Sequence, residues 1–487
     1  MSSSSAEVSL RELVALMTAR CVDVALVRAV TTMLWFVCRP AALVRALIQQ
    51  WDDVADAEGL DTSPTLLLLC ASRLRIVYVL SQWADSGALR VDCCDDPDAA
   101  TALLHVVQSA RLAPRTEGSS LDASVRRIAA AAAGGPRSAT LSDSRAELCR
   151  ARRASGLHLS MSAEAALSLV RNATPKAIAE QLTLLEFWHY AGISARELAQ
   201  RCVGGASLRA ARGAAAAACD GDTPASPEEH AAAAAAAAEA AASAVSIVAD
   251  MVDVFNRRAR GVKLLVLARG GAKTRAKRAA RWIEVASELR QLHNFNTLFA
   301  VVAALTDPFV KRFALPPGSR HASAASTSAL AELAEDVDAR GGYANYRAAL
   351  RKAEGGHPCI PALPVVLKDM STVDCAHAAR GVRVRGGGGA GGGGGGSASE
   401  GGPAADAAQR GGVRCEAAAD EGDARIDVAK LLRLSRCAHD FTRWQTREYT
   451  SLTPDVHLQA ALRLTLEKHG KSSADVVALA RECDGAG

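Results

Sequence analysis

The chain has 487 residues, of which 49% are hydrophobic but only 4% aromatic, and its formal net charge is +5. This length exceeds what one hydrophobic core usually serves, so we expect two domains joined by low-complexity segments. So small a charge does not by itself indicate a nucleic-acid or membrane partner. The thirteen cysteines include no C-x-x-C pair, which argues against a metal or dithiol site.

The ends and the apolar runs give no sign of membrane insertion. The N-terminus, MSSSSAEVSLREL, lacks the basic and then apolar segments of a signal peptide. The longest apolar run, residues 66–80, is interrupted by Arg73 and Arg75. We therefore expect a cytoplasmic protein with reduced thiols, and the alanine-rich, strand-poor composition favours an all-α fold.

Several helices are predicted in the first 110 residues. Leu10, Leu13 and Leu16 are spaced to share one helical face, and Leu43, Leu47 and Trp51 follow at i, i+4 and i+8. Residues 65–87 predict a buried helix that ends at a glycine, and residues 98–110 a further short helix. A helical N-terminal domain is the simplest interpretation.

Low-complexity segments divide the remaining chain. Residues 113–160 predict a linker with at most short helices, and residues 204–242 an alanine-rich insertion. Alanine favours helix but supplies little apolar surface for packing. The glycine-rich residues 382–424 cannot bury surface or restrict the backbone, so they predict a flexible loop.

The segment 273–313 predicts two amphipathic helices that meet at a corner. Its apolar residues recur every three or four positions, with one change of register near Asn294. His293 and Asn294 are suited to close the first helix, because Asn tolerates left-handed dihedral angles. Asn296 is expected to cap the second helix through its side-chain oxygen. The spacing alone indicates a pair of core helices and no function.

A function is suggested by resemblance. Residues 282–302, WIEVASELRQLHNFNTLFAVV, resemble the central signature of the catalytic domain of Ras-family guanine nucleotide exchange factors. Three further blocks follow the family's order: AEQLTLLE at 179–186, PCIPALPVVL at 358–367, and RIDVAKLLRLSR from Arg425. Residues 35–51 and 73–83 resemble the Ras exchanger motif that precedes this domain, with a generic helical bundle as the alternative.

The resemblance implies a domain order. It gives an all-α protein in which a helical catalytic domain with a protruding helical hairpin follows a smaller helical domain. The exchanger-motif domain would span 1–112, the linker 113–160, the catalytic domain with its two insertions 161–470, and a C-terminal tail 471–487. The hairpin helices would span about 366–377 and 426–445.

The resemblance also implies an activity without covalent chemistry or a cofactor. No phosphate-binding loop, dinucleotide-binding motif, metalloprotease motif or nucleophile elbow occurs in a usable context. An exchange factor needs none of these, because it binds the nucleotide-free GTPase better than the nucleotide-bound form. The expected partner is a Ras-like small GTPase of the Ras, Rap or Ral type. A scaffold that binds a GTPase without releasing nucleotide is the alternative.

Site residues are assigned by position in the resemblance. The GTPase-binding cleft would be lined by Val248, Met251, Val252, Leu305, Thr306, Tyr343, Ile360 and Leu363. For the aliphatic members, core packing is an equally good interpretation. On the first hairpin helix the candidates for catalysis are Lys368, Ser371, Asp374, Cys375 and His377.

Two departures from the family pattern affect exchange efficiency. Cys375-Ala376-His377 stands where the family commonly has a carboxylate followed by Gly-Asn, and Asp374 lies one place earlier. A thiol does not supply the negative charge that would compete for magnesium. Residues 307–313 also carry one extra residue relative to the family.

A basic tract runs from Arg257 to Arg281 with ten cations and no acidic residue. Such a stripe could attract the anionic inner surface of a membrane, which makes a membrane-binding adaptor a third interpretation. A solvated helix face is the simpler explanation. No aromatic residue is interleaved for base stacking, so we expect no nucleic-acid partner.

Overall fold

The structure is a computed structural model that describes residues 7–34, 37–56, 63–86, 88–108, 120–133, 161–199, 201–202, 247–316, 321–378 and 426–468. Over these residues the fold is helical, which confirms the predicted all-α class. The only strands in the described part are β1 (Glu7–Val8) and β2 (Ile426–Asp427), which pair antiparallel with Glu7 opposite Asp427. No described helix is long and apolar enough to cross a bilayer.

The chain forms two compact units that interleave in sequence. Unit 1 comprises Met1–Gly134, Ala199–Ser226 and Lys368–Arg436, and unit 2 comprises Gly135–Leu198, Pro227–Leu367 and Cys437–Gly487. The predicted insertions at 204–242 and 382–424 and the tail at 471–487 lie outside the described residues. The domain boundaries drawn from the sequence therefore stay a prediction.

Unit 1 contains seven N-terminal helices among the described residues. They are α1 (Leu10–Met17), α2 (Val24–Thr32), α3 (Pro40–Asp56), α4 (Ser63–Asp85), α5 (Ala88–Asp95), α6 (Pro97–Gln108) and α7 (Ser120–Ala132). The helices expected over 65–87 and 98–110 are thus present as α4 and α6. Helix α7 falls within the predicted linker, as one of the short helices expected there.

The first helix shows where simple spacing fails. Ser9 and Glu12 form a capping box at the start of α1. Leu13 is fully buried but Leu16 is 45% exposed, so the predicted face through Leu16 is wrong. Each step of three residues turns the side chain about 60° away from its starting face, because a helix has about 3.6 residues per turn. The buried face passes instead through Val14 and Met17.

Unit 2 holds the helices of the central segment. They are α9 (Ala163–Asn172), α10 (Pro175–Ala191), α13 (Ile247–Leu267), α14 (Ala272–Gln291), α15 (Phe295–Leu305), α16 (Pro308–Phe313), α17 (Ala324–Asp336), α18 (Ala344–Lys352) and α21 (Val456–Leu462), followed by a π-helical turn, Arg463–Lys468. Two short 3₁₀ turns, Arg340–Gly342 and Ala353–Gly355, flank α18.

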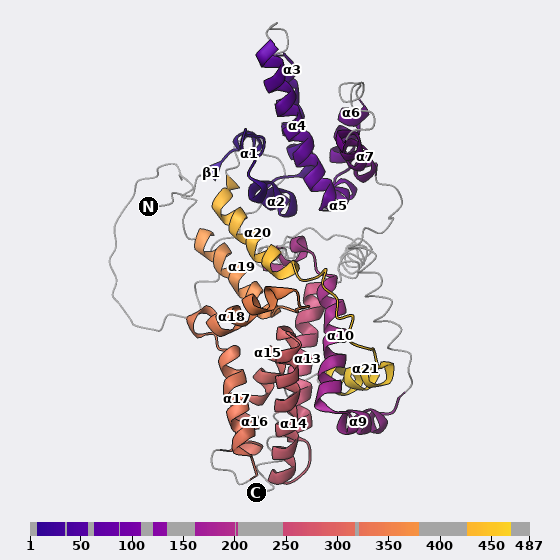
Figure 1. Ribbon diagram of the computed structural model, residues 1–487, viewed down its shortest axis with the longest axis vertical. Coiled ribbons are helices and arrows are strands. Elements are labelled where there is room, and N and C mark those ends of the chain that lie inside the picture. Colours follow the sequence, from indigo (N-terminus) through magenta and orange to yellow (C-terminus); the bar gives the residue numbers. More distant parts are fainter. Residues whose placement is uncertain are drawn as a thin grey trace, which may run out of the picture. The chain divides into compact units, whose positions relative to one another are not determined.

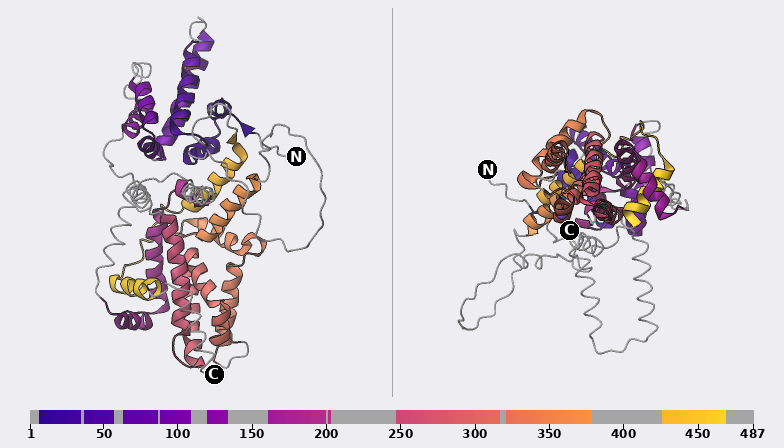
Figure 2. Two further views of the ribbon diagram at one scale, coloured as in Figure 1. Left: turned by 180° about the vertical axis from the view of Figure 1, so that it is seen from behind. Right: turned by 90° about the horizontal axis from the view of Figure 1, so that it is seen from below.

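Helix α15 is the core of unit 2. Almost every residue of it is buried, because α13 and α14 pack beside it. Figure 1 shows these three helices running side by side, and the two views of Figure 2 agree. Two further helices, α19 (Leu363–Ala378) and α20 (Val428–Thr442), correspond to the two expected hairpin helices.

The predicted corner between α14 and α15 is present, with its roles redistributed. His293, not Asn294, has the left-handed backbone, with φ of 53°. Asn294 is the N-cap of α15, and its Oδ1 accepts a hydrogen bond from Thr297 N at 3.1 Å. The assignment of the cap to Asn296 is therefore wrong, because that side chain is fully buried and bonds elsewhere.

Candidate functional site

A buried ion pair lies at the centre of unit 2. Glu186 at the end of the AEQLTLLE block and Arg258 on α13 form a salt bridge, with only 1% and 2% of their side chains exposed. Burial lowers the pKa of Arg258, and the Glu467 carboxylate, whose Oε1 lies 3.1 Å from Nε, opposes this. A guanidinium stays charged in proteins, so the pair is ionic.

Polar side chains of α15 complete the surroundings of Glu186. Asn296 Nδ2 donates to Glu186 Oε1, and Thr297 Oγ1 donates to Oε2 at 3.3 Å. Asn294 Nδ2 donates to Thr183 Oγ1 at 3.1 Å. A buried charge is tolerated only when it is paired and hydrogen-bonded, and this arrangement satisfies both conditions for Glu186.

The same network reaches the start of α19. Asn296 Oδ1 accepts a hydrogen bond from the backbone N–H of Leu363, the first residue of that helix, at 3.0 Å. The preceding segment is held by Ile360, whose N–H donates to His293 O at 3.0 Å and whose carbonyl accepts from Phe295 N at 2.9 Å. The base of the first hairpin helix is thus bonded directly to the core helix α15.

Close backbone packing holds Glu467, the second acidic partner of Arg258, in place. Glu467 lies on the π-helical turn that packs against α13. A Cβ atom at Gly261 of α13 would lie 2.5 Å from the carbonyl oxygen of Leu466. Glycine is therefore required at this position of α13 for the turn to approach.

The structure divides the predicted cleft residues into two groups. Fully buried in the core of unit 2 are Val248, Met251, Leu305, Ile360 and Leu363. Partly accessible are Val252, Thr306 and Tyr343. Because these three stand on α13, at the end of α15 and before α18, the accessible part of the predicted cleft draws on three separate elements.

Tyr343 has an unusual setting. Its backbone is left-handed, with φ of 62°, immediately before α18. Its ring lies 6.0 Å from the ring of Phe299, which in turn packs edge-on against Tyr346. A left-handed non-glycine residue persists only where its surroundings fix it. The aromatic contact orients the Tyr343 side chain next to α15.

The predicted catalytic residues lie along α19. Lys368, Ser371 and Cys375 are exposed. Asp374 is about one quarter exposed and pairs with Lys430 of α20, with Nζ 2.6 Å from Oδ1. The side chain of His377 lies outside the described residues. The carboxylate at Asp374 is therefore engaged with the second hairpin helix.

The end of α20 is connected to α10. Gln445 Nε2 donates to the carbonyls of Tyr190 and Ile193, at 2.7 Å each. Tyr190 OH donates to Phe441 O at 2.5 Å, and burial is the main cause that raises the pKa of Tyr190. The C-terminal end of α20 and the residues that follow it are therefore bonded to α10 within unit 2.

The sequence analysis did not predict that Glu186, Arg258 and Glu467 form one cluster of ion pairs. Arg258 was assigned to a surface tract because it lies in a run of cations, and its burial contradicts that part of the assignment. A signal was present, since Glu186 is the one charged residue in the largely apolar run LTLLEFW, and a buried carboxylate there needs a cationic partner.

Comparisons with known proteins agree with this arrangement. Residues 177–383 match the family model described as RasGEF domain. RAS guanyl-releasing protein 4 of Mus musculus is 38% identical over 129 residues, which cover 26% of this chain and 19% of that protein. Ras guanyl-releasing protein 3 of Homo sapiens is 38% identical over 122 residues, covering 25% and 17%.

A relative of lower sequence identity also matches this chain. Ras guanine nucleotide exchange factor K of Dictyostelium discoideum is 31% identical over 127 residues, covering 26% of this chain and 8% of that protein. The chain thus spans less than a fifth of the length of these curated relatives.

Proposed function

This chain carries a RasGEF domain in residues 177–383, and from that premise we propose that it is a guanine nucleotide exchange factor for a Ras-like small GTPase. The observation that carries the proposal is the bonded base of α19. Asn296 hydrogen-bonds both to the first residue of this helix and to Glu186 of the buried ion pair. These hydrogen bonds fix where α19 begins, and the resemblance implies that the hairpin displaces a switch segment of the GTPase.

The proposed mechanism involves no covalent step and no cofactor. The chain binds the nucleotide-free GTPase more tightly than the nucleotide-bound form, so complex formation shifts the population toward an open nucleotide pocket. Val252, Thr306 and Tyr343 are the accessible side chains that would contact the GTPase directly. The buried members of the predicted cleft would shape the surface beneath them.

The exposed face of α19 supplies the residues that would act on the nucleotide site. Lys368, Ser371 and Cys375 are exposed on this face. Asp374 carries a negative charge one place before the position where the family commonly has a carboxylate, and it pairs with Lys430. Because Cys375 is a thiol, the charge offered to the magnesium or phosphate site would come from Asp374.

The direct test is release of fluorescent mant-GDP from purified Ras, Rap and Ral type GTPases. The full chain is expected to accelerate release from at least one of them, and Tyr343→Ala to reduce that acceleration. Lys176→Gln, an exposed lysine at the start of α10, is the matched control and is expected to behave as the wild type.

A second candidate function is GTPase binding without exchange. The observation that favours it is the exposed Cys375 in place of a carboxylate. Tight binding of a GTPase, combined with an unchanged rate of mant-GDP release, would support this scaffold function and reject exchange.

A further inference from the structure

One end of unit 2 presents an exposed group of cations. We call it the basic end and define it by Arg269, Lys273, Lys277, Lys311 and Arg312, all of which are exposed. Arg269 follows α13, the first two lysines lie in the opening turns of α14, and Lys311 and Arg312 lie on α16. Three elements therefore contribute to it.

Hydrogen bonds from the Arg275 side chain to backbone carbonyls join these elements. Arg275 Nε donates to Phe313 O at 3.1 Å, which ties the start of α14 to the end of α16. Arg275 Nη1 also donates to Gly270 O at 2.7 Å, which fixes the loop after α13. The exposed lysines on α14 and α16 are thus held on a common frame.

Other cations of the tract are used inside the fold. Arg258 is buried against Glu186, and Lys263 pairs with Asp307 at 2.6 Å. Arg281 Nη2 donates to Val170 O at 2.9 Å. Within the tract, these cations differ from Arg269, Lys273 and Lys277, which are exposed.

The two sequence segments that carry the basic end lack acidic residues. Residues 254–283 and 308–331 contain no Asp or Glu. Burial lowers the pKa of Arg278, and the neighbouring cations Arg171 and Arg275 lower it further. Like charges that crowd a guanidinium in this way indicate a positive local potential.

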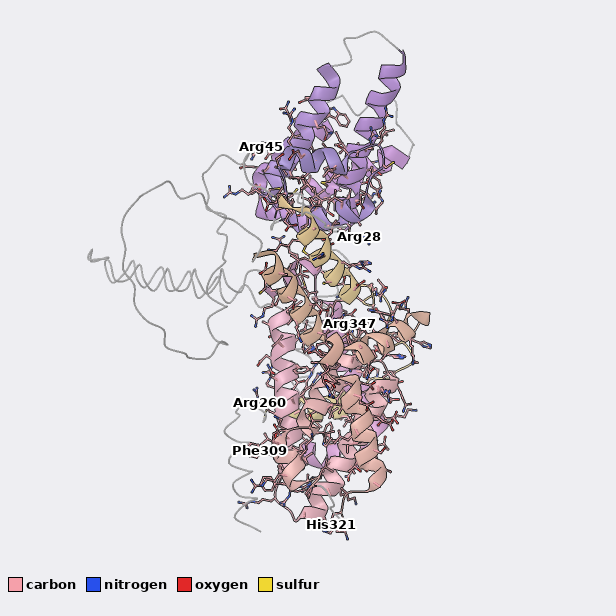
Figure 3. All side chains as sticks on the ribbon, turned by 90° about the vertical axis from the view of Figure 1, so that its left-hand side faces the viewer. Arg28, Arg45, Arg260, Phe309, His321 and Arg347 are labelled. Atoms are coloured by element: carbon pink, nitrogen blue, oxygen red, sulfur yellow. The ribbon has the colours of Figure 1, made fainter. Side chains whose placement is uncertain are left out.

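An aromatic side chain accompanies the cations. Phe309 is partly exposed on α16, beside the exposed Pro308. Figure 3 places Phe309 between Arg260 and His321 along this part of unit 2. Phe313 differs from Phe309, because the Arg312 guanidinium covers its ring at 5.1 Å from the centroid. Phe309 is the ring of α16 whose contact with a partner is least obstructed.

We propose that the basic end docks on an anionic phospholipid membrane, with Lys273, Lys277 and Lys311 against the lipid headgroups and Phe309 at the interface. Lysine is a flexible point charge, which suits a diffuse negative surface. An apolar ring flanked by cations matches the composition of interfacial membrane anchors. Single-stranded nucleic acid would need several open rings for stacking, and α16 offers one.

The test measures binding of the full chain to vesicles by sedimentation. Wild-type protein is expected to bind phosphatidylcholine vesicles that contain about one third phosphatidylserine, and to bind less at high salt. The variant Lys273→Gln/Lys277→Gln is expected to bind about thirtyfold more weakly, since each lysine near such a surface contributes a factor of about five. Phe309→Ser is expected to weaken binding as well.

The matched control is Arg351→Gln/Lys352→Gln, which removes the same charge from exposed positions on α18 and is expected to bind as the wild type. Equal loss in the control and the α14 variant would overturn the proposal, as would no binding by the wild type. Binding of a single-stranded oligonucleotide that depends on Lys273 and Lys277, without vesicle binding, would reassign the surface to nucleic acid.

Discussion

Removing the buried cation Arg258 should destabilise unit 2 far more than removing a comparable cation at its surface. Arg258→Met leaves the Glu186 carboxylate without its cation at 1% exposure. Breaking a buried pair by removing one partner costs about 3–5 kcal/mol. Glu186 keeps hydrogen bonds from Asn296 and Thr297, and Glu467 at 18% exposure can be hydrated. We therefore expect the lower end, about 3 kcal/mol.

Two variants isolate the buried charge. Lys263→Met removes a cation from the same helix, but its pair with Asp307 is partly exposed, so the expected cost is about 1 kcal/mol or less. Arg258→Met/Glu186→Gln removes both charges and keeps an acceptor for Asn296. The double variant is expected to be more stable than Arg258→Met alone, because the fully buried carboxylate at position 186 is no longer charged.

Amide hydrogen exchange read by mass spectrometry locates the effect. Peptides from α10 and α15 are expected to lose about a hundredfold in protection in Arg258→Met, which corresponds to about 3 kcal/mol of local opening free energy. Protection in Arg258→Met equal to that in Lys263→Met would refute the reasoning. So would a double variant that is no more stable than Arg258→Met alone.

Three further predictions concern pH, thiol reactivity and the hairpin. Burial lowers the pKa of His293, so protonation favours the unfolded chain and the free energy of unfolding should fall as pH drops below about 6.5. In urea titrations, His293→Asn should flatten this pH dependence, because Asn tolerates the left-handed backbone. An unchanged pH dependence in this variant would contradict the prediction. Burial raises the pKa of the Cys359 thiol, so iodoacetamide should modify the exposed Cys375 before Cys359, as read by peptide mapping. Equal modification rates of the two thiols would contradict the burial of Cys359. Asp374→Asn removes the ion pair with Lys430 and should slow mant-GDP exchange by about tenfold or more. The free energy of unfolding should change by about 1 kcal/mol or less. A variant that fails to fold would count against a functional role of Asp374.

Local features of the fold were predictable because they depend on neighbouring residues. Thr174 and Pro175 are the residue types that favour an N-cap and a first helical position, and the structure has Thr174 as the N-cap of α10 with Pro175 in its first turn. The corner near Asn294 was likewise visible as a change in apolar register. These signals act over a single helical turn, so the sequence carries them directly.

The site was less predictable because its partners are distant in sequence. Asn296 stands where a cap is plausible, yet its bonding partner Leu363 lies 67 residues away. Arg258 lies in a cationic run that reads as surface, and its partner Glu186 belongs to a different helix. The resemblance also placed Met251 and Val252 together in the cleft, but adjacent helical residues point about 100° apart, so Met251 is buried and Val252 is partly accessible.

The exchange rate tests the central proposal most directly. Purified full chain is mixed with mant-GDP-loaded GTPases of the Ras, Rap and Ral types in excess unlabelled GDP, and fluorescence decay is followed. We predict faster decay for at least one of them, in proportion to the concentration of the chain, and a smaller effect for Tyr343→Ala. Folded chain that leaves every decay at its intrinsic rate would contradict the proposed function.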